Sequence, residues 1–298
     1  MTDAIRTEGL TKSYGEARGV FALDLQVLEG EIFGFLGPNG SGKTTTIRLL
    51  LDLIRPDSGR ASVFGHDCRR EATEVHRLTG YLPGEFALDA KLSGRQLLTY
   101  LGNLRGGIDW AYAEGVATRL ELDLDRPFGQ YSRGNKQKVG LAQAFVHRPR
   151  LLILDEPTGG LDPINQEAVL DLVREARDGG ATVFFSSHIL SEVEDICDRV
   201  SFIRDGRLVR VGPVHEIIRA RGHSVEAECA MPPDADAFAP LAGVSKVEVE
   251  GTHIRFHIQG DMQEAIAVLA RFGPKDLISR EPSLTEIFVG LYESDEDP

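Results

Sequence analysis

The sequence is poor in cysteine and has no long apolar run. Its three cysteines, Cys68, Cys197 and Cys229, lie far apart without a C-x-x-C pair, which is typical of a reducing cytosol and gives no metal-site pattern. The first residues lack the charged and then apolar layout of a signal peptide. No stretch approaches the roughly 20 apolar residues of a membrane helix. We therefore expect a cytosolic chain that cannot itself cross a bilayer.

Basic residues are outnumbered by acidic ones. Lys and Arg total 33 against 46 Asp and Glu, so the formal net charge is −13. A surface of this sign repels phosphate backbones, and we therefore expect no nucleic-acid partner. Hydrophobic residues make up 42% of the 298 residues. This length and composition predict one large and one small domain, each with a core of its own.

Residues 1–219 show alternating strand and helix patterns, which predict an α/β domain. Strand patterns over residues 5–36 end in the apolar run Ile32–Leu36, as in a strand buried on both faces. A helix pattern follows from Lys43 to about Ile54, and an insertion at about 87–148 is helical. Apolar strands return at 151–154 and 182–185, and a hairpin turns at Asp205-Gly206.

Residues 220–292 predict a second, small domain, and residues 293–298 an acidic tail. The pattern is a strand, a short helix near 235–241, a hairpin turning at Gly251, a helix, a strand and a final helix. This β-α-β-β-α-β order predicts a ferredoxin-like α+β domain. The spacings of Asp261 with Glu264 and of Ser283 with Glu286 indicate capping boxes at the last two helices.

A glycine-rich segment fits the pattern of a phosphate-binding loop. It lies between a buried strand and a helix, where the backbone N–H groups and the positive end of the helix face phosphate oxygens. We expect Lys43 to reach the β- and γ-phosphates of ATP and the Thr44 hydroxyl to coordinate Mg²⁺. The residues assigned to nucleotide binding are Gly37, Pro38, Asn39, Gly40, Ser41, Gly42, Lys43, Thr44 and Thr45.

Two carboxylates, Asp155 and Glu156, end the apolar strand that begins at Leu151. Successive residues of a strand point in opposite directions, so the two side chains face different places. Asp155 suits Mg²⁺ binding, and Glu156 suits orienting or deprotonating the attacking water. Beside a phosphate-binding loop, this pair predicts nucleotide hydrolysis.

Four further segments distinguish among phosphate-loop ATPases. Tyr131-Ser-Arg-Gly-Asn-Lys-Gln137, Gly159-Gly-Leu-Asp162, Ser186-Ser-His188 and Thr11-Lys-Ser-Tyr14-Gly15 resemble the signature, D-loop, H-switch and A-loop of the ABC ATPase family. The order and spacing of these motifs resemble that family over residues 4 to about 218. The resemblance implies a P-loop NTPase fold with a RecA-like core, an antiparallel β-subdomain and a helical insertion.

This resemblance also implies partners and roles. The expected assembly is a head-to-tail homodimer with two ATP molecules between the chains, working on separate transmembrane permease subunits at the cytoplasmic face of the cell membrane. Ser132 and Gly134 would serve the partner's nucleotide, and Asp162 in the D-loop would also contact nucleotide. Tyr14 would stack on adenine, and His188 would act with Glu156 in hydrolysis. The form of the signature is similar to that of bacterial exporters of drugs and antibiotics, which is the function we expect.

One segment departs from the family pattern. Gly84 and Glu85 follow Tyr81-Leu82-Pro83, where the family usually has a glutamine directly after the proline. Glu85 is a candidate for part of the role of this glutamine at Mg²⁺ or the attacking water. The alternative is that Glu85 faces the membrane subunit and transmits movement, because a carboxylate near the γ-phosphate adds repulsion.

Two other functions are alternatives. A soluble ABC ATPase acting on chromosomes, DNA damage or ribosomes would need a long coiled coil, zinc cysteines or a second cassette. The interval from Lys43 to Ser132 is short, and no cysteine pair is present. A small-molecule P-loop kinase would not need the signature or His188. We therefore expect a transport ATPase, while the function of the small domain stays open between dimer stabilisation and regulation.

Overall fold

The computed structural model describes residues 2–15, 18–84, 90–220 and 222–293. The chain divides into two compact units, Met1–Gly212 and Pro213–Pro298. This division falls before the predicted boundary at residue 219, so helix α8 (Val214–Arg219) is grouped with the C-terminal unit. Among the described residues, no helix has the length and hydropathy to cross a membrane.

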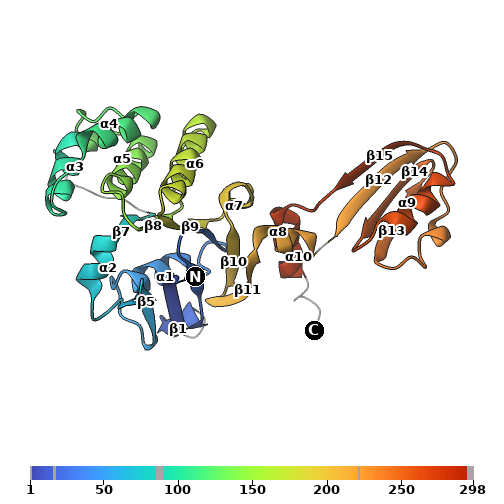
Figure 1. Cartoon of the computed structure of the whole chain (residues 1–298), viewed down its shortest axis with the longest axis horizontal. Helices are drawn as coiled ribbons and strands as arrows, with labels where there is room; N and C mark the ends of the chain where they lie inside the picture. Colours follow the sequence, from blue (N-terminus) through green and yellow to red (C-terminus); the bar gives the residue numbers. More distant parts are fainter. Residues whose placement is uncertain (1, 16–17, 85–89, 221, 294–298) are drawn as a thin grey trace. The chain divides into compact units, whose positions relative to one another are not determined.

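A six-stranded sheet lies at the centre of the first unit (Figure 1). Its order is β11-β10-β4-β9-β8-β7, and the pairings from β10 to β7 are parallel. Every residue of β4, β8 and β9 is buried, as expected of strands covered on both faces. The strands are β4 (Ile32–Leu36), β7 (Thr79–Leu82), β8 (Leu151–Asp155), β9 (Thr182–Ser187), β10 (Arg199–Arg204) and β11 (Arg207–Pro213).

Asp205 and Gly206 form the predicted turn between β10 and β11, both with the positive φ that a tight hairpin turn requires. Parallel pairing places the carboxyl ends of neighbouring strands at one edge of the sheet, the usual location of ligands in such folds. Helices α1 (Lys43–Leu50), α6 (Pro163–Asp178) and α7 (Leu190–Ile196) contact β8 or β9. Helix α1 ends at Leu50, before the predicted end at about Ile54. It cannot continue because Asp52 adopts a left-handed backbone with a φ of 51°.

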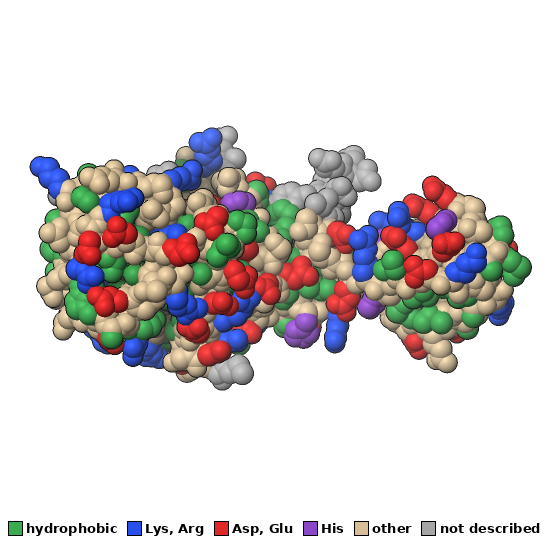
Figure 2. Space-filling model, turned by 90° about the horizontal axis from the view of Figure 1, so that it is seen from above, with side chains coloured by type: hydrophobic (Ala, Val, Ile, Leu, Met, Phe, Trp, Pro, Cys, Tyr) green, Lys and Arg blue, Asp and Glu red, His purple; other side chains and the backbone are tan. Residues whose placement is uncertain are grey.

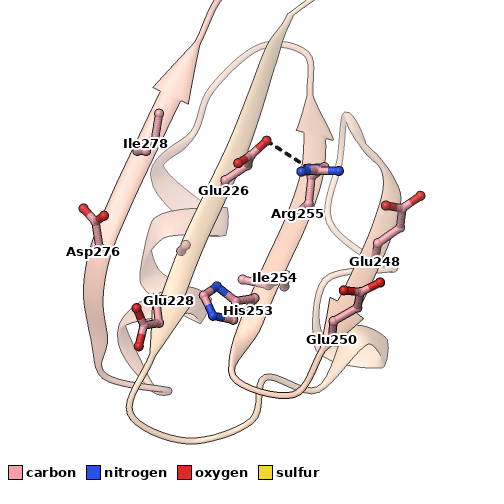
Figure 3. A pocket seen from close by; sticks show the side chains of 10 residues that line it. Glu226, Glu228, Glu248, Glu250, His253, Ile254, Arg255, Asp276 and Ile278 are labelled. Atoms are coloured by element: carbon pink, nitrogen blue, oxygen red, sulfur yellow. Dashed lines mark hydrogen bonds and ion pairs between the residues drawn. The ribbon is translucent and has the colours of Figure 1, made fainter.

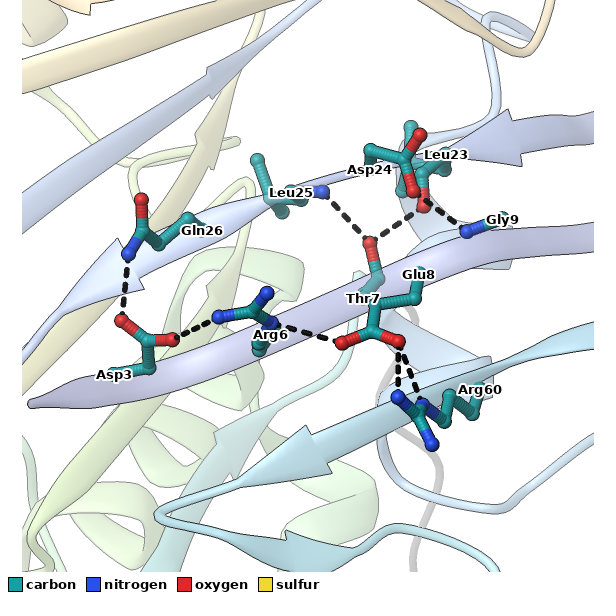
Figure 4. A network of polar contacts seen from close by, with 10 residues as sticks. All are labelled: Asp3, Arg6, Thr7, Glu8, Gly9, Leu23, Asp24, Leu25, Gln26 and Arg60. Atoms are coloured by element: carbon teal, nitrogen blue, oxygen red, sulfur yellow. Dashed lines mark hydrogen bonds and ion pairs between the residues drawn. The ribbon is translucent and has the colours of Figure 1, made fainter.

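An antiparallel sheet of five strands covers part of this unit: β1 (Asp3–Ser13), β2 (Gly19–Leu23), β3 (Gln26–Leu28), β5 (Ser58–Val63) and β6 (His66–Asp67). The buried Thr7 joins β1 to the gap between β2 and β3 (Figure 4). Its hydroxyl donates to the Leu23 carbonyl oxygen at 2.7 Å and accepts from the Leu25 N–H at 2.8 Å. Thr7 thus satisfies two backbone groups where the ladder is interrupted.

The predicted insertion at 87–148 is helical where it is described. It holds α3 (Gly94–Asn103), α4 (Trp110–Arg119), the 3-10 turn η1 (Phe128–Gln130) and α5 (Arg133–Phe145). Ser93 and Gln96 form a reciprocal capping box at α3. The preceding helix α2 (Ala72–Leu78) lies between β6 and β7 in the chain. Helix α5 packs against both α4 and β7, so the insertion is anchored to the parallel sheet.

The C-terminal unit contains an antiparallel sheet in the order β13-β14-β12-β15, which is that of the split β-α-β arrangement. Its first predicted helix is only the 3-10 turn η2 (Ala235–Ala237), because Pro240 restricts the residue before it and cannot donate a helical hydrogen bond. The other elements are β12 (His223–Cys229), β13 (Val244–Glu250), β14 (His253–Ile258), α9 (Gln263–Ala270), β15 (Pro274–Arg280) and α10 (Leu284–Glu293).

One of the two capping boxes predicted here is present. Ser283 and Glu286 exchange side-chain to backbone hydrogen bonds of 3.2 and 3.3 Å. The other prediction is wrong, since Asp261 accepts from the N–H of Gln263 two residues later and is not the N-cap of α9.

The C-terminal unit is acidic. Residues 213–298 carry 16 acidic against 7 basic side chains, and Asp and Glu are visible over both units in Figure 2.

Candidate functional site

The glycine-rich loop connects β4, which ends at Leu36, to α1, which begins at Lys43. Gly40 and Gly42 have φ values of 84° and 114°, which side chains rarely allow. At Gly37 a Cβ atom would lie 2.4 Å from the backbone oxygen of Ile203, so only glycine fits. The first N–H groups of α1 have no partner within the helix and are available to an anion. The loop therefore has the shape and donors of a phosphate cradle.

Lys43 lies across this loop and is almost fully buried. Its Nζ atom donates to the carbonyl oxygens of Gly37 at 2.6 Å and Pro38 at 3.3 Å. Burial lowers the pKa of this ammonium group, against the opposing effect of the nearby carboxylates of Glu156 and Asp155. A desolvated cation held inside an anion-binding loop is suited to bind phosphate oxygens.

Thr44 and Asp155 meet although they are far apart in the sequence. The Thr44 hydroxyl donates to Asp155 Oδ2 at 2.9 Å, and the Ser186 hydroxyl donates to Asp155 Oδ1 at 3.1 Å. Burial raises the pKa of Asp155, while these two hydrogen bonds oppose the rise. A hydroxyl and a carboxylate oxygen beside a phosphate cradle are the hard oxygen ligands that Mg²⁺ prefers, so the residues fit this ion.

Glu156 lies between two positively chargeable side chains. Its Oε1 atom is 3.7 Å from Lys43 Nζ and 3.3 Å from His188 Nδ1. Glu156 has a φ of 51°, a left-handed conformation that costs a non-glycine residue energy and is maintained only by its surroundings. The side chain is about one third exposed, which leaves room for a water molecule to approach. The structure thus brings together Lys43, Glu156 and His188, which lie in three separate motifs of the sequence.

A second group of predicted site residues lies at the N-terminus of α5. Ser132 is the N-cap of this helix and accepts from the Asn135 N–H at 3.2 Å. A Cβ atom on Gly134 would be 3.0 Å from the Gly160 carbonyl oxygen, so the signature and D-loop segments are adjacent. Asp162 caps α6 and accepts from the N–H and the side-chain amide of Asn165, which lower its pKa. Ser132 and Asp162 are exposed and Gly134 is half-buried, so the helix N-terminal donors lie at the surface.

Gln137 links the two groups, although in the sequence analysis it only completes the signature segment. Its side-chain amide donates to the backbone carbonyl oxygens of Glu156 at 3.1 Å and Pro157 at 3.2 Å. Gln137 is buried and lies one helical turn into α5 from the Ser132 cap. The helix that presents Ser132 is thereby tied to the backbone of Glu156.

Three predicted site residues remain: Gly84, Glu85 and Tyr14. A Cβ atom on Gly84 would be 3.3 Å from Asp155 Oδ2, so this glycine is next to the carboxylate assigned to Mg²⁺. Glu85 lies outside the described residues, and both readings of it stay predictions. The Tyr14 ring is 55% exposed, with Lys12 Nζ 5.8 Å from its centroid. An exposed aromatic ring of this kind is available for stacking.

The strand–loop–helix cradle with its lysine, threonine and carboxylates is the site of a P-loop NTPase. The family model described as ABC transporter matches residues 20–159. A daunorubicin resistance ATP-binding protein of Streptomyces coeruleorubidus is 36% identical, over 98% of this chain and 96% of that protein. A bacitracin transport ATP-binding protein of Bacillus licheniformis is 40% identical, over 72% of this chain and 71% of that protein.

A solved structure described as the ATP-binding subunit of an ABC transporter superposes with a TM-score of 0.67. It is 29% identical and covers 72% of this chain and 92% of its own. The chain therefore belongs to the ABC transporter family, as one of its ATP-binding subunits. This finding confirms the predicted family and the predicted P-loop fold of the large domain.

Proposed function

We propose that this chain hydrolyses ATP in a head-to-tail pair and thereby drives a membrane permease that exports drugs, antibiotics or similar amphiphilic molecules. The observation that carries the proposal is the convergence of Lys43, Glu156 and His188 beside the Thr44–Asp155 pair at the end of the parallel sheet. These side chains come from three separate sequence motifs. Their convergence supplies phosphate binding, ion binding and a base in one place.

In the proposed hydrolysis, the cradle and Lys43 hold the β- and γ-phosphates and compensate their charge. A water oxygen bonds to the γ-phosphorus while the bond from that phosphorus to the ADP oxygen breaks. Glu156 takes the proton of this water, and His188, at 3.3 Å from Glu156, holds the carboxylate and the γ-phosphate in register. Thr44 and Asp155 would hold Mg²⁺, which supplies charge neutralisation of the phosphate oxygens when it is bound.

The pairing of two chains follows from the position of the α5 N-terminus. Ser132 and Gly134 offer donors to an anion, while the nucleotide of their own chain is already surrounded by the loop from Gly37 to Thr45. We assign these donors, with Asp162, to the γ-phosphate side of the partner's nucleotide. Tyr14 would stack on the adenine of its own nucleotide. Closure of the pair on ATP and its opening after hydrolysis would move the permease.

We assign the permease contact to a groove beside Pro83. A largely apolar groove of about 290 Å³ lies between the parallel sheet and the helical insertion, lined by Leu51, Leu53, His76, Thr79, Tyr81, Pro83, Leu101, Arg105 and Gln143. An exposed apolar groove of this kind suits a helix from a partner protein. Through this contact the chain would sit at the cytoplasmic face of the membrane. The export of drugs is inferred from the names of the daunorubicin and bacitracin relatives.

The test is Glu156→Gln in the full transporter. The amide still forms hydrogen bonds but cannot take a proton, so we expect ATP binding to persist and turnover to fall by about a thousandfold or more. ATP should then trap a closed dimer, measured by light scattering. Glu175→Gln on α6, a surface residue paired with Arg119, is the matched control. Near-normal turnover in Glu156→Gln would refute the role of this carboxylate.

A further inference from the structure

The two edges of the C-terminal sheet differ in regularity. At the β13 edge, the pairing with β14 shifts register between Ser245 and Glu248, and Lys246 has a φ of 51°. Such a bulge interrupts the edge and opposes the addition of another strand. At the β15 edge, the pairing with β12 also shifts register, between Glu228 and Cys229, but this shift lies before Asp276 and the pairing is unbroken from Asp276 to Arg280. The segment Asp276–Arg280 is therefore regular and presents backbone hydrogen-bonding groups to a new strand.

Strand β15 is also exposed along its whole length. All of its residues, Pro274–Arg280, are exposed. Leu277 pairs with Ala227, a residue of the core face, yet remains 41% exposed. Ile278 lies on the opposite face and is 54% exposed (Figure 3). A short edge strand therefore leaves two large apolar side chains uncovered, one on each face of the sheet.

We propose that β15 pairs antiparallel with β15 of a second copy of this chain, around a two-fold axis at Ile278. The two four-stranded sheets would then form one continuous sheet. The hydrophobic cores of the two C-terminal units, one from each copy, would lie on the same side of this sheet. The free backbone N–H and C=O groups of each β15 would form hydrogen bonds with the other β15.

The register follows from the faces of the strand. If both cores are to lie on one side, opposite residues must belong to the same face, so the axis passes through a residue. An axis at Asp276 would oppose two aspartates, and an axis at Leu277 would place Asp276 opposite Ile278. An axis at Ser279 would place Ile278 opposite Arg280. The axis at Ile278 alone among these places Asp276 of each copy opposite Arg280 of the other.

The charges available on β15 favour this pairing. Within the part of the chain that the structure describes, Asp276 forms no ion pair. Arg280 reaches Glu226 only at 3.8 Å, and Glu226 already binds Arg255 at 2.9 Å. Arg280 is 61% exposed, so its guanidinium is available to a second copy. The two Asp276–Arg280 pairs would flank two apposed Ile278 side chains, and opposite charges and apolar pairs both stabilise facing strands.

The acidity of the C-terminal unit does not exclude this contact. Glu248 and Glu250 lie on β13, three strand spacings or about 14 Å from β15. This distance exceeds the Debye length of about 8 Å at physiological salt, so their repulsion of the other copy is screened. Glu226 and Glu228 lie nearer, on β12 beside Ile278 and Asp276, and Glu226 is paired with Arg255 at 2.9 Å. The charges directly opposite each other across the joint are those of Asp276 and Arg280, which attract. The contact uses no residue of the nucleotide site and does not require ATP.

Cross-linking of the full chain without nucleotide tests the axis. Ile278→Cys brings two thiols face to face at the two-fold axis, so we expect a covalent dimer under mild oxidation or with a short bis-maleimide. The three native cysteines are buried and serve as background in the wild type. Ile266→Cys on α9 is the matched control, since this isoleucine belongs to the same unit and is 48% exposed. Equal cross-linking of the two variants would overturn the proposal.

A charge exchange measured by sedimentation equilibrium tests the register. Asp276→Arg opposes like charges twice and should weaken the dimer about tenfold or more. Combining it with Arg280→Asp should restore the affinity to within about threefold. Glu250→Arg changes the net charge equally but lies on β13, so it should have little effect.

A nucleotide-free chain that stays monomeric at every concentration tested would refute the self-pairing. A dimer whose affinity does not change in Asp276→Arg would refute it as well. Protection of Ile278→Cys from labelling only when the membrane subunit is co-expressed would assign β15 to that subunit and also overturn it. Repeating the measurement with Lys43→Ala separates this contact from ATP-driven pairing. Failure of the ATPase function would leave this dimer unchanged.

Discussion

The amide of Gln137 is predicted to position the catalytic carboxylate. Gln137 donates two hydrogen bonds to the backbone at Glu156 and Pro157, and Glu156 holds a left-handed backbone there. Gln137→Met keeps the length of the side chain but removes both donors. Each neutral hydrogen bond is worth about 1 kcal/mol net, so the loss is about 2 kcal/mol. If this energy maintains Glu156 in the reacting geometry, the turnover number should fall about 30-fold.

The assay is steady-state ATP hydrolysis with kcat and KM measured separately. We expect kcat to fall while KM for ATP changes little, because Lys43 and the phosphate loop are intact. Gln143→Met is the matched control on the same helix. Gln143 donates to the Tyr81 carbonyl oxygen and does not contact Glu156, so its kcat should change less than about threefold.

Gln137→Glu adds a pH signature to this prediction. The carboxylate has no donor and faces two carbonyl oxygens, whereas its protonated form donates one hydrogen bond. The activity of this variant relative to the wild type should therefore rise as the pH falls, while the relative activity of Gln137→Met should stay flat. A kcat near that of the wild type in Gln137→Met, with only the free energy of unfolding reduced, would show that the contact is structural and refute the positioning role.

Two further predictions concern the pair of chains and the antiparallel sheet. In mixed dimers, Lys43→Ala in one chain and Ser132→Arg in the other damage the same composite site and leave the second site intact. Both changes in one chain damage both sites. Equal residual ATPase activity of these two dimers would contradict head-to-tail sharing. Thr7→Val leaves the buried groups of Leu23 and Leu25 without their partner and should lower the free energy of unfolding by about 2 kcal/mol in urea titrations. The control is Thr118→Val, because Thr118 is exposed and its hydroxyl bonds only within α4. This change should alter the free energy of unfolding by less than about 0.5 kcal/mol. An equal loss of stability in the two variants would contradict the role of Thr7.

The sequence predicted most reliably the features that depend on near neighbours. The run Ile32–Leu36 is fully buried, and Lys43 begins a helix where the phosphate-loop pattern placed it. Errors occurred where a local interaction competes with the periodic pattern. Asp52 ends α1 with a left-handed backbone, and Pro240 limits a predicted helix to the turn η2. In both cases the apolar spacing was correct, but one residue determined where the helix could continue.

The convergence of the site depends on strand order, which the sequence did not reveal. Asp155 and Ser186 are paired across β8 and β9, and Leu36 and Ser187 across β4 and β9. This order brings Thr44 to Asp155 and His188 to Glu156 although the motifs are far apart in the chain. The resemblance to a family predicted the proximity, but periodicity alone could not. The contact of Gln137 with Glu156 had no sequence signal that distinguished it from ordinary helix burial.

The last prediction concerns Gly84, which stands where the family usually has glutamine. A Cβ atom here would be 3.3 Å from Asp155 Oδ2, tighter than ordinary van der Waals contact, so a side chain requires the carboxylate assigned to Mg²⁺ to shift by a few tenths of an ångström. Gly84→Ala should therefore reduce kcat several-fold and raise the Mg²⁺ concentration needed for half-maximal hydrolysis. Gly84→Gln should have the same two effects and should not restore a ligand. Both effects are measured in Mg²⁺ titrations of ATPase activity. The control is Gly115→Ala on α4, because a Cβ atom there meets no atom within 4 Å. An increase of kcat in Gly84→Gln at unchanged Mg²⁺ dependence would show that Asp155 tolerates the side chain and that the missing glutamine limits turnover.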